Sequence, residues 1–468
     1  MTSGRRYEDW AVRIIKRLKQ IKEIRMKAIR SILGQVIILT LGNSVALWAL
    51  TDFGTGVKAG AAAVLSVLYI ILLINAGGKR DSDKKLARIA KGAYLIDSAV
   101  CALVLETAVI IVFIIIGGMS VWRHIGSGLL AFGLITITAI AGLVRLAGSA
   151  RQIKLALYAA LIFCWYIPVV NIIILKKISR SARKEFRFEQ AKHELDDLRK
   201  ENEVCKTRYP ILMVHGIFFR DWQKFNYWGR IPKELIRNGA EVYYGGQQSA
   251  DPIPVSAAEL RDRILEVIGQ SGAEKVNIIA HSKGGLDSRY AISKLGMDEY
   301  VASLTTINTP HYGCKFVDNI LSKVSDGLLK FVARRYDRLF TVLGDTAPSF
   351  EKGLRELTFE NCSKLDDELP DSPKVRYKSV MSKMNGLFSA GFPLNLGYLL
   401  NKPYGSGNDG LVTVESALRG ENTLMIEHKG KRGLSHGDLI DLFRENIDGF
   451  DVREFYVELV KELKDSGF

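Results

Sequence analysis

The fold of the C-terminal part of this 468-residue chain is decided by one stretch, Lys275-Val276-Asn277-Ile278-Ile279-Ala280-His281-Ser282-Lys283-Gly284-Gly285. Its β-branched residues Val276, Ile278 and Ile279 suit a buried central strand. The two glycines after Ser282 remove side-chain bulk where a following helix must pass close to that strand. The stretch therefore predicts a strand, a tight turn that carries Ser282, and a helix.

This order of elements matches the pattern G-x-S-x-G, with Ala280 in place of the first glycine. In that pattern a sharp strand-to-helix turn exposes the serine hydroxyl at the edge of a parallel sheet. The alternative is a Ser/Gly loop that only turns the chain, but strand, turn and helix occur in the required order. We therefore expect an α/β-hydrolase fold, a mostly parallel sheet flanked by helices, with Ser282 as its nucleophile.

The sequence around this stretch alternates between strand and helix patterns from Tyr209 onward. Strands are expected at 210–214, 240–244 and 301–307, and helices at 227–238 and 257–269. Such alternation implies right-handed crossovers and a largely parallel sheet. Catalytic groups then lie at the carboxyl ends of strands, where Ser282 falls.

A serine hydroxyl needs a base, and in this fold the acid and then the histidine follow the serine along the chain. Three histidines follow Ser282. His311 ends the next strand, before any plausible acid loop, and His428 ends a strand-like run that leaves its orientation open. His436 lies in a turn, Gly433-Leu434-Ser435-His436-Gly437-Asp438, that leads into a helix. We expect His436 to be the base.

The acid is expected at Asp409, in the glycine turn Ser406-Gly407-Asn408-Asp409-Gly410-Leu411-Val412. That turn enters an apolar stretch and can fix a carboxylate against a histidine. The alternatives Asp366, Asp367 and Asp371 are expected to form a solvated cluster. The oxyanion donors are expected to be the backbone N–H groups of Lys283 and Ile217; His215, beside Ile217, is then structural.

The N-terminal part has a different composition. Residues 1–30 predict a basic amphipathic arm on a membrane surface, or a solvated helix, and residues 31–175 predict about five transmembrane helices. These lie at about 31–51, 58–77, 94–117, 127–147 and 154–175. Residues 176–207 read as a charged linker, and 208–468 as the hydrolase domain. No cleavable signal peptide, disulfide framework or zinc-type spacing is expected.

The net charge of +15 is carried largely by Lys and Arg beside the apolar runs. That position favours anionic lipid headgroups and topology signals over nucleic acid. The basic arm and the basic loop at 78–93 are expected on the cytoplasmic side of the membrane. Five spans would then place the catalytic domain outside the cytoplasm. The basic residues after 175 argue instead for a catalytic domain on the cytoplasmic side. We give more weight to the number of spans, and therefore favour a domain outside the cytoplasm.

Residues 208–315 resemble the bacterial true triacylglycerol lipases of the Pseudomonas/Burkholderia type, in the α/β-hydrolase superfamily. The matching segments are Tyr209 to Gly216, Tyr227-Trp228, Ile231-Pro232, Asn238 to Tyr243, Val276 to the elbow and Pro310-His311. The turns around Asp409 and His436 resemble the family's acid and histidine loops. The N-terminal spans have no counterpart in those secreted enzymes.

The resemblance also implies a structural calcium ion between two aspartates. Asp438 fits one of them, but residues 385–400 contain no Asp or Glu for the other. We therefore expect no cofactor, with Asp438 at most a weak calcium ligand. The family's disulfide has no obvious pair here. The region at about 315–350 corresponds to the lid, with an amphipathic helix at 328–340; an ordinary packed helix is the alternative.

These observations predict an integral membrane protein, of a bacterial cell membrane, that hydrolyses acylglycerol esters through Ser282, Asp409 and His436 and an acyl-enzyme. The expected partners are a lipid or ester substrate and the bilayer. A phospholipid or lipid-anchor deacylase, or an acyltransferase, would use the same triad. A membrane transport or sensory protein with a ligand-binding hydrolase-like domain is the alternative from another class.

Overall fold

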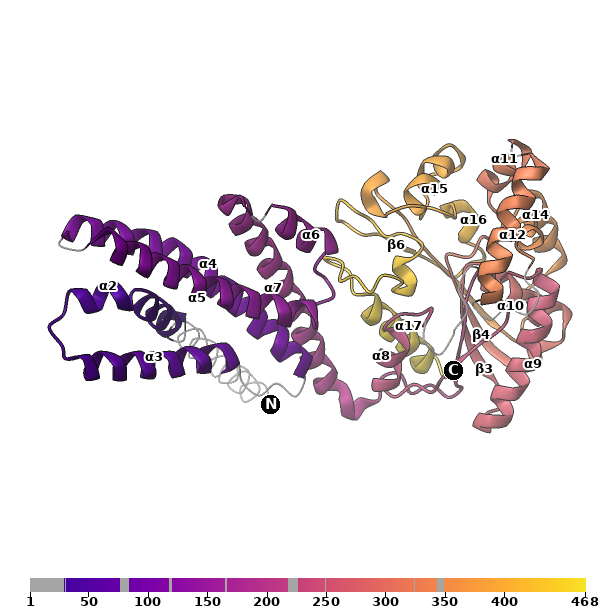
Figure 1. The fold of residues 1–468 in the computed structure, drawn as a ribbon. Coiled ribbons are helices and arrows are strands. Elements are labelled where there is room, and N and C mark those ends of the chain that lie inside the picture. The colour runs from indigo at the N-terminus through magenta and orange to yellow at the C-terminus, as the bar shows by residue number, and fades with distance from the viewer. Residues whose placement is uncertain are drawn as a thin grey trace. The chain divides into compact units, whose positions relative to one another are not determined.

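The structure is a computed structural model, and it describes Ile29 and residues 31–75, 84–117, 120–164, 166–217, 226–248, 250–323, 325–342 and 349–468. It forms two compact units, Met1–His193 and Glu194–Phe468 (Figure 1). The predicted arm, residues 1–30, lies outside the described residues except for Ile29. Its placement on a membrane stays a prediction.

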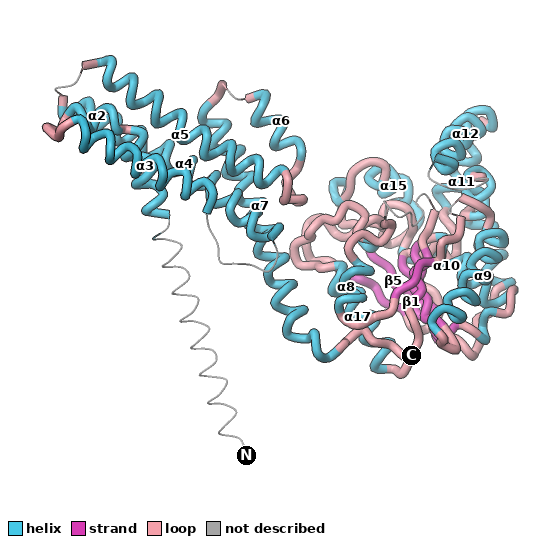
Figure 2. The backbone as a smooth tube through the Cα atoms, turned by 60° about the horizontal axis from the view of Figure 1, so that its bottom comes forward, coloured by secondary structure: helices cyan, strands magenta, loops and turns pink. Residues whose placement is uncertain are grey.

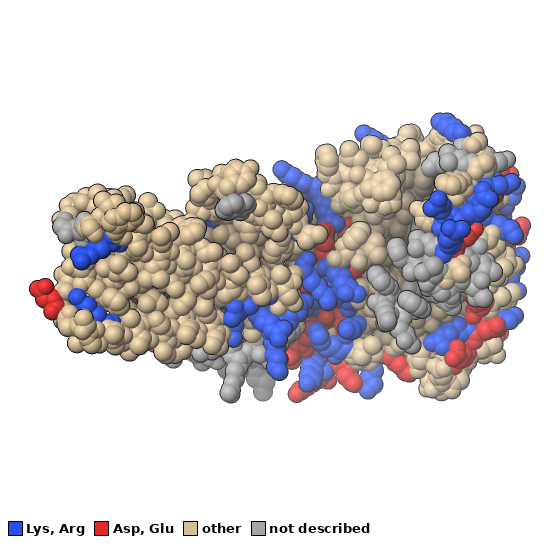
Figure 3. Space-filling view, in the orientation of Figure 1, with Lys and Arg blue, Asp and Glu red and all other residues tan. Residues whose placement is uncertain are grey.

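The described part of the first unit is helical. Its helices are Ser31–Gly42, α2 Ser44–Ala49, α3 Thr55–Asn75, α4 Lys84–Ile116, α5 Val121–Ala147, α6 Leu155–Phe163 and α7 Pro168–Arg199, which runs on into the second unit. By length and composition, three described helices could cross a membrane: Thr55–Ile74, Lys84–Ile116 and Val121–Ala147. Their surface is mostly uncharged in Figure 3, which is consistent with a transmembrane region.

Helices α4 and α5 pack closely because small residues face one another. A Cβ atom added at Gly92 of α4 would lie 2.7 Å from the Leu146 side chain, and one added at Gly142 of α5 would lie 2.8 Å from that of Ile96. Small residues let helix backbones approach each other in this way within apolar helical bundles.

Two of the five predicted spans are not single helices. The stretch 31–51 is interrupted at Asn43, between Ser31–Gly42 and α2. The stretch 154–175 is divided into the nine-residue α6 and α7, which begins at Pro168. Proline suits a first helical turn but cannot continue a helix from before it. Residues 176–199 of the predicted charged linker are helical and continue α7.

The second unit contains a six-stranded parallel sheet (Figure 2). Its strands are β1 Ile211–Val214, β2 Val242–Tyr244, β3 Val276–His281, β4 Val301–Ile307, β5 Arg376–Ser382 and β6 Thr423–Ile426, in the order β2-β1-β3-β4-β5-β6. The chain proceeds one way from β1 to β2 and the other way from β3 to β6. Ligands of such sheets bind at the carboxyl ends of the strands, where this direction changes.

Alternate residues of the central strands face opposite sides of the sheet. Ile211 and Met213 pack into a core with α8 Ile231–Arg237 and α17 Val452–Asp465. Leu212 packs into a second core with α9 Ile253–Ser271 and α10 Lys283–Lys294. Both faces are therefore covered by helices, which confirms the predicted α/β-hydrolase fold.

The remaining helices lie between the later strands. They are α11 Lys315–Lys323, α12 Asp326–Val342, α13 Phe350–Glu356, α14 Phe359–Glu368, α15 Leu394–Asn401 and α16 Val414–Ala417. The first four connect β4 to β5, and α15 and α16 connect β5 to β6. Strands β1 and β4 agree with their predicted ranges, whereas the helix predicted at 227–238 begins only at Ile231.

Candidate active site

Ser282 occupies a sharp turn between β3 and α10. Its backbone has φ of +55° and ψ of −132°, an unfavourable conformation for a residue with a side chain. Two backbone hydrogen bonds hold it there: the Ser282 N–H donates to Ile307 O (3.0 Å), and the Gly285 N–H donates to Ser282 O (3.0 Å). The surrounding sheet and helix therefore maintain the strained turn that the sequence predicts.

The glycines of the elbow are required by close packing. A Cβ atom at Gly284 would lie 2.3 Å from His215 O, and one at Gly285 would lie 2.2 Å from Thr309 Oγ1. A Cβ atom at Gly216 would lie 2.7 Å from the Cβ of Ser282. The segments that follow β1 and β4 thus close around the turn that carries Ser282.

Asp409 and His436 form a direct hydrogen-bonded pair. His436 Nδ1 donates to Asp409 Oδ2 at 2.6 Å, and the His436 backbone N–H donates to Asp409 O at 2.8 Å. The other carboxylate oxygen of the fully buried Asp409 accepts from the N–H groups of Leu411 (2.9 Å) and Val412 (2.8 Å). The backbone turn around Asp409 therefore fixes the carboxylate, and the carboxylate fixes the orientation of the imidazole.

The His436 ring lies beside the elbow. It packs against the ring of His281, the residue before Ser282, with 4.4 Å between the ring centroids. Burial lowers the pKa of His281 well below its usual value, so this imidazole is neutral. The structure thus brings the base and acid expected from the sequence to the turn that carries Ser282.

A buried tyrosine, Tyr227, contacts the elbow in a way that the sequence did not predict. Its hydroxyl lies 2.7 Å from His281 Nδ1 and accepts from the Gly216 N–H at 3.1 Å. It therefore links the loop after β1 to the end of β3. The sequence shows that His281 directly precedes the serine. It does not show that His281 contacts Tyr227, 54 residues away, because only the fold brings these two residues together.

The expected oxyanion donors lie next to this turn. Lys283 begins α10, and Ile217 directly follows Gly216, whose backbone closely approaches Ser282. That these two N–H groups donate hydrogen bonds to a substrate oxygen stays a prediction. The Lys283 side chain is instead buried, and its ammonium donates to Ser256 Oγ (3.0 Å) and Asp287 Oδ1 (2.8 Å).

The alternative histidines have other contacts. His428 Nε2 lies 2.6 Å from Asp448 O. His311 Nε2 lies 3.0 Å from Thr306 Oγ1, and burial, with neighbouring arginines, lowers the pKa of His311 well below its usual value. The structure pairs neither of them with Asp409.

The alternative acids Asp366 and Asp371 are not a solvated cluster. Asp366 pairs with the buried Arg289 (2.7 Å) and with Arg419 (2.6 Å), and Asp371 pairs with Arg419 (2.6 Å). Their prediction as freely solvated is wrong for these two residues, because the guanidinium groups come from α10 and from the segment after α16. Neither carboxylate bonds a histidine in the described contacts.

The residues around Asp438 do not fit a metal ion. One Asp438 oxygen accepts from Arg432 Nη2 at 2.7 Å, and the other accepts from the N–H (2.8 Å) and Oγ (2.7 Å) of Ser435. A calcium ion needs six to eight oxygen ligands. Within the described residues, no group of three or more His, Cys, Asp or Glu side chains could hold a metal.

The predicted lid corresponds to α11 and α12. Helix α12 is held to α13 by a stacked ring pair, Tyr336 and Phe350, with centroids 4.7 Å apart, and by the Phe350 N–H, which donates to Asp337 Oδ1 (2.8 Å). Ala333 is buried in the same cluster, whereas Phe331 is exposed. The side chain of Phe340 lies outside the described ones. Movement of this segment stays a prediction.

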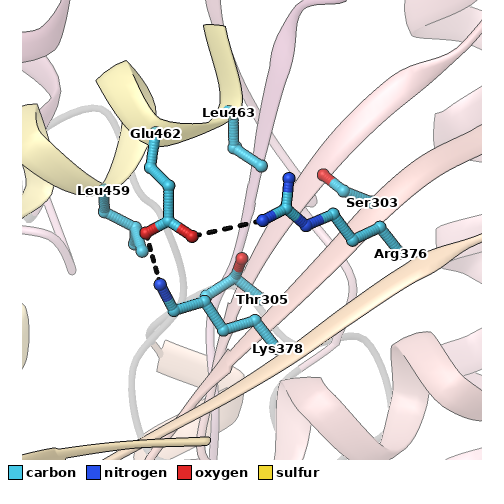
Figure 4. A pocket seen from close by; sticks show the side chains of 7 residues that line it. All are labelled: Ser303, Thr305, Arg376, Lys378, Leu459, Glu462 and Leu463. Atoms are coloured by element: carbon cyan, nitrogen blue, oxygen red, sulfur yellow. Dashed lines mark hydrogen bonds and ion pairs between the residues drawn. The ribbon is translucent and has the colours of Figure 1, made fainter. Parts of the chain in front are cut away.

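A small pocket lies elsewhere on the sheet (Figure 4). It is lined by residues of β4, β5 and α17: Ser303, Thr305, Arg376, Lys378, Leu459, Glu462 and Leu463. Glu462 pairs there with Arg376 and Lys378. Ser303 and Thr305 are the third and fifth of the seven residues of β4, and Arg376 and Lys378 are the first and third of the seven residues of β5, so none of them ends its strand. This pocket holds a structural ion pair.

The chain is similar to known esterases and lipases. Residues 212–344 match the family described as "Putative serine esterase (DUF676)". The chain is 34% identical over 180 residues to a triacylglycerol lipase of Pseudarthrobacter phenanthrenivorans (36% of this chain, 55% of that protein) and to one of Burkholderia plantarii (36% and 49%). It is 27% identical over 268 residues to triacylglycerol lipase 2 of Saccharomyces cerevisiae (52% and 75%).

Among solved structures, the mature form of the Bacillus licheniformis lipase BlEst2 is similar, with 22% identity, a TM-score of 0.39, and coverage of 50% of this chain and 87% of that one. The chain spans about half the length of the two bacterial relatives named above. Their similarity, together with the parallel sheet and the serine elbow, supports a lipase-like α/β-hydrolase domain.

Proposed function

We propose that this chain is a membrane-anchored serine ester hydrolase that cleaves acylglycerol esters through Ser282, His436 and Asp409. The observation that carries the proposal is the 2.6 Å hydrogen bond between His436 and the buried Asp409, beside the strained turn of Ser282. A domain that only binds a ligand has no need of an oriented acid and base next to a strained serine.

In the proposed mechanism, Nε2 of His436 accepts the Ser282 proton as Oγ attacks the ester carbonyl carbon. The carbonyl π electrons move to the oxygen, which the N–H groups of Ile217 and Lys283 stabilise. The C–O bond to the alcohol then breaks, and His436 protonates the leaving alcohol. His436 next deprotonates a water molecule, which attacks the acyl-enzyme carbonyl carbon. The bond from that carbon to Ser282 Oγ then breaks, and His436 gives the proton to Oγ, which releases the fatty acid and restores free Ser282.

Asp409 has two roles in this scheme. Its bond to Nδ1 leaves Nε2 free of a proton and facing the reaction, and its negative charge stabilises the imidazolium that forms. Because Leu411 and Val412 donate to its other oxygen, the carboxylate stays in place while the histidine changes charge.

The proposed substrate class rests on two observations. The named relatives are triacylglycerol lipases. The same chain carries three apolar helices long enough to cross a bilayer, so a lipid phase is the expected source of substrate. Digestion of outward-facing and inverted vesicles with a protease would identify the side of the membrane that the hydrolase domain occupies.

The test is labelling with a fluorophosphonate, followed by a panel of acylglycerols, phospholipids and short-chain esters. The proposal expects labelling and hydrolysis in the wild type and neither in Ser282→Ala. Ser293→Ala is the matched control, because it removes a hydroxyl from α10, the helix that follows Ser282, and that hydroxyl bonds only Pro370 O in the described contacts (2.8 Å). Equal labelling of wild type and Ser282→Ala would refute the nucleophile, and acyl transfer to added alcohols would indicate the acyltransferase.

A further inference from the structure

Arg432 joins three segments around the candidate base. It lies four residues before His436, and its guanidinium makes three hydrogen bonds. Nη2 donates to Asp438 Oδ1 (2.7 Å), Nη1 donates to Glu445 Oε2 (2.6 Å), and Nε donates to the backbone oxygen of Ser389 (2.7 Å). One side chain thus connects the 3₁₀ turns Leu387–Ser389 and Asp438–Ile440 with the loop that follows the second.

The backbone of Arg432 is itself anchored to the end of β5. Its carbonyl accepts from the Asn385 N–H (3.2 Å), and the Leu434 N–H donates to Lys383 O (2.8 Å). Between them Gly433 has φ of +67°, and a Cβ atom there would lie 2.4 Å from the Asn385 nitrogen. The histidine loop is therefore held against this edge of the sheet by its backbone and by Arg432.

The contact at Asp438 leads directly to the base. The second oxygen of this buried carboxylate bonds the N–H and the hydroxyl of Ser435, the residue before His436. A buried carboxylate is costly without a positive partner. Arg432 supplies that charge, so the bonds that orient Ser435, and with it His436, depend on Arg432.

We propose that the Arg432 guanidinium is the cation that positions the histidine loop of this chain, at Asp438, where the resemblance noted from the sequence would imply a calcium ion. Three oxygens, from Asp438, Glu445 and Ser389, bond one planar group with donors in a fixed fork. This inference rests on the proposed function, because it makes Arg432 a positioning residue for His436. Arg432 itself does not contact the substrate in this mechanism.

The experiment compares Arg432→Gln with Arg419→Gln in the full chain in detergent micelles. Arg419 also bridges two carboxylates, Asp366 and Asp371, but neither contacts the histidine loop in the described bonds. For a soluble short-chain ester, Arg432→Gln should lower kcat about 10- to 100-fold with KM within about twofold, as expected for the loss of a group that orients a reacting residue. Arg419→Gln should keep kcat within about twofold.

Thermal unfolding with EDTA or added Ca²⁺ gives a readout that does not depend on activity. We expect neither reagent to change the Tm or kcat of the wild type. Arg432→Lys, which keeps the charge but not the fork, should recover part of kcat. Asp438→Asn, which keeps the shape of the carboxylate, should reproduce the kcat loss if Arg432→Gln does not fold.

Two results would overturn the inference. One is a wild type whose Tm and kcat fall in EDTA and return with Ca²⁺, since a metal would then hold the loop. The other is an Arg432→Gln protein that loses stability as Arg419→Gln does but keeps its kcat. A wild type that no fluorophosphonate labels would instead refute the proposed function. The response of its Tm to EDTA and Ca²⁺ would still test whether Arg432 or a metal ion holds the histidine loop.

Discussion

At the scale of single residues, the candidate site depends on backbone groups as much as on side chains. Asp409 is held by two N–H groups of its own turn and by the backbone of His436, which donates to its carbonyl oxygen. Ser282 is held in a strained conformation by bonds from both sides of the elbow. For the proposed mechanism, such an arrangement would fix the three groups before substrate arrives, which is the usual basis of efficient acyl transfer.

The first prediction ranks substitutions by their effect on ester hydrolysis. His436→Ala should be about as damaging as Ser282→Ala, at roughly 10³-fold or more in kcat, because these groups act as a unit. Asp409→Asn should be intermediate, since the imidazole loses its orientation but remains present. His428→Ala, the control, should retain most activity, because that ring bonds Asp448 O instead.

Steady-state kinetics on a soluble ester, with circular dichroism to verify folding, would check this ranking. A greater loss in His428→Ala than in His436→Ala would move the base to His428.

The second prediction concerns Asp287, which is buried beside Lys283. Burial raises the pKa of Asp287 to about 7, although Lys283 opposes the shift. Because the unfolded carboxyl titrates near pH 4, the folded state binds the extra proton between about pH 4 and pH 7. This group's contribution to stability is therefore complete below about pH 4 and is lost as the pH rises towards 7, by up to about 1.4 kcal/mol per pH unit.

Urea unfolding of wild type and Asp287→Asn at several pH values would measure this contribution. The difference in unfolding free energy between the two proteins should change with pH in that window, since all other groups are shared. A difference that stays constant from pH 4 to 7 would show that the carboxylate remains charged against Lys283.

At the scale of elements, strands, helices and turns that are marked by residues within their own sequence could be predicted. The elbow has β-branched residues, a serine and two glycines in a fixed order, and the turns of Asp409 and His436 are marked by glycines. The contacts of Tyr227 and Arg432 were not predictable, because their partners are brought together only by the fold. The division of the predicted span 154–175 before Pro168 was not predicted either, because hydropathy alone does not weigh the helix-breaking effect of a proline.

The third prediction belongs to α12. One side of this helix is fixed to α13 through Tyr336 and Asp337, and Phe331 remains exposed with Arg335 over its ring. If the helix is a lid, its exposed face enters lipid when it opens, because burial of apolar surface favours that state. Phe331→Asp should then lower hydrolysis of long-chain esters in micelles several-fold and leave monomeric short-chain esters unaffected.

Rates measured below and above the aggregation point of one ester series would check this. Phe331→Leu is the control that keeps an apolar side chain. A wild-type rate that rises smoothly through the aggregation point would identify α12 as an ordinary packed helix.

At the scale of the whole molecule, each unit presents apolar surface in its own way. The long helices of the first unit expose aliphatic side chains along their length, as a membrane region does. In the second unit, the segment that precedes and forms α15 exposes two phenylalanines, Phe388 (93%) and Phe392 (80%). Large apolar side chains exposed in succession mark a surface that contacts lipid or protein.

This segment is joined to the candidate site through Leu394. A Cβ atom added at Gly410, in the acid turn, would lie 3.0 Å from the Leu394 side chain, and one at Gly437, in the histidine turn, would lie 3.8 Å from it. A surface that enters lipid through Phe388 and Phe392 would therefore lie next to the loops of the acid and the base.

The last prediction uses this surface to test why a hydrolase domain would be joined to helices that are long and apolar enough to cross a membrane. A tether raises the effective concentration of the domain at its own bilayer, so contacts of the domain with lipid contribute less there. For substrate in other vesicles, the exposed phenylalanines must supply the contact themselves. Phe388→Ser with Phe392→Ser should lower hydrolysis in separate vesicles about tenfold, and hydrolysis in the protein's own vesicles only about twofold.

Reconstituted full-length protein, with fluorogenic acylglycerol placed either in its own vesicles or in added ones, would measure both rates. Phe359→Ser is the matched control, because Phe359 is exposed on α14, where Lys315 lies over its ring at 4.7 Å. Equal losses in the two vesicle populations would mean that the phenylalanines act on the site itself and not on docking. No loss in either population would show that the exposed pair does not contribute to docking on lipid.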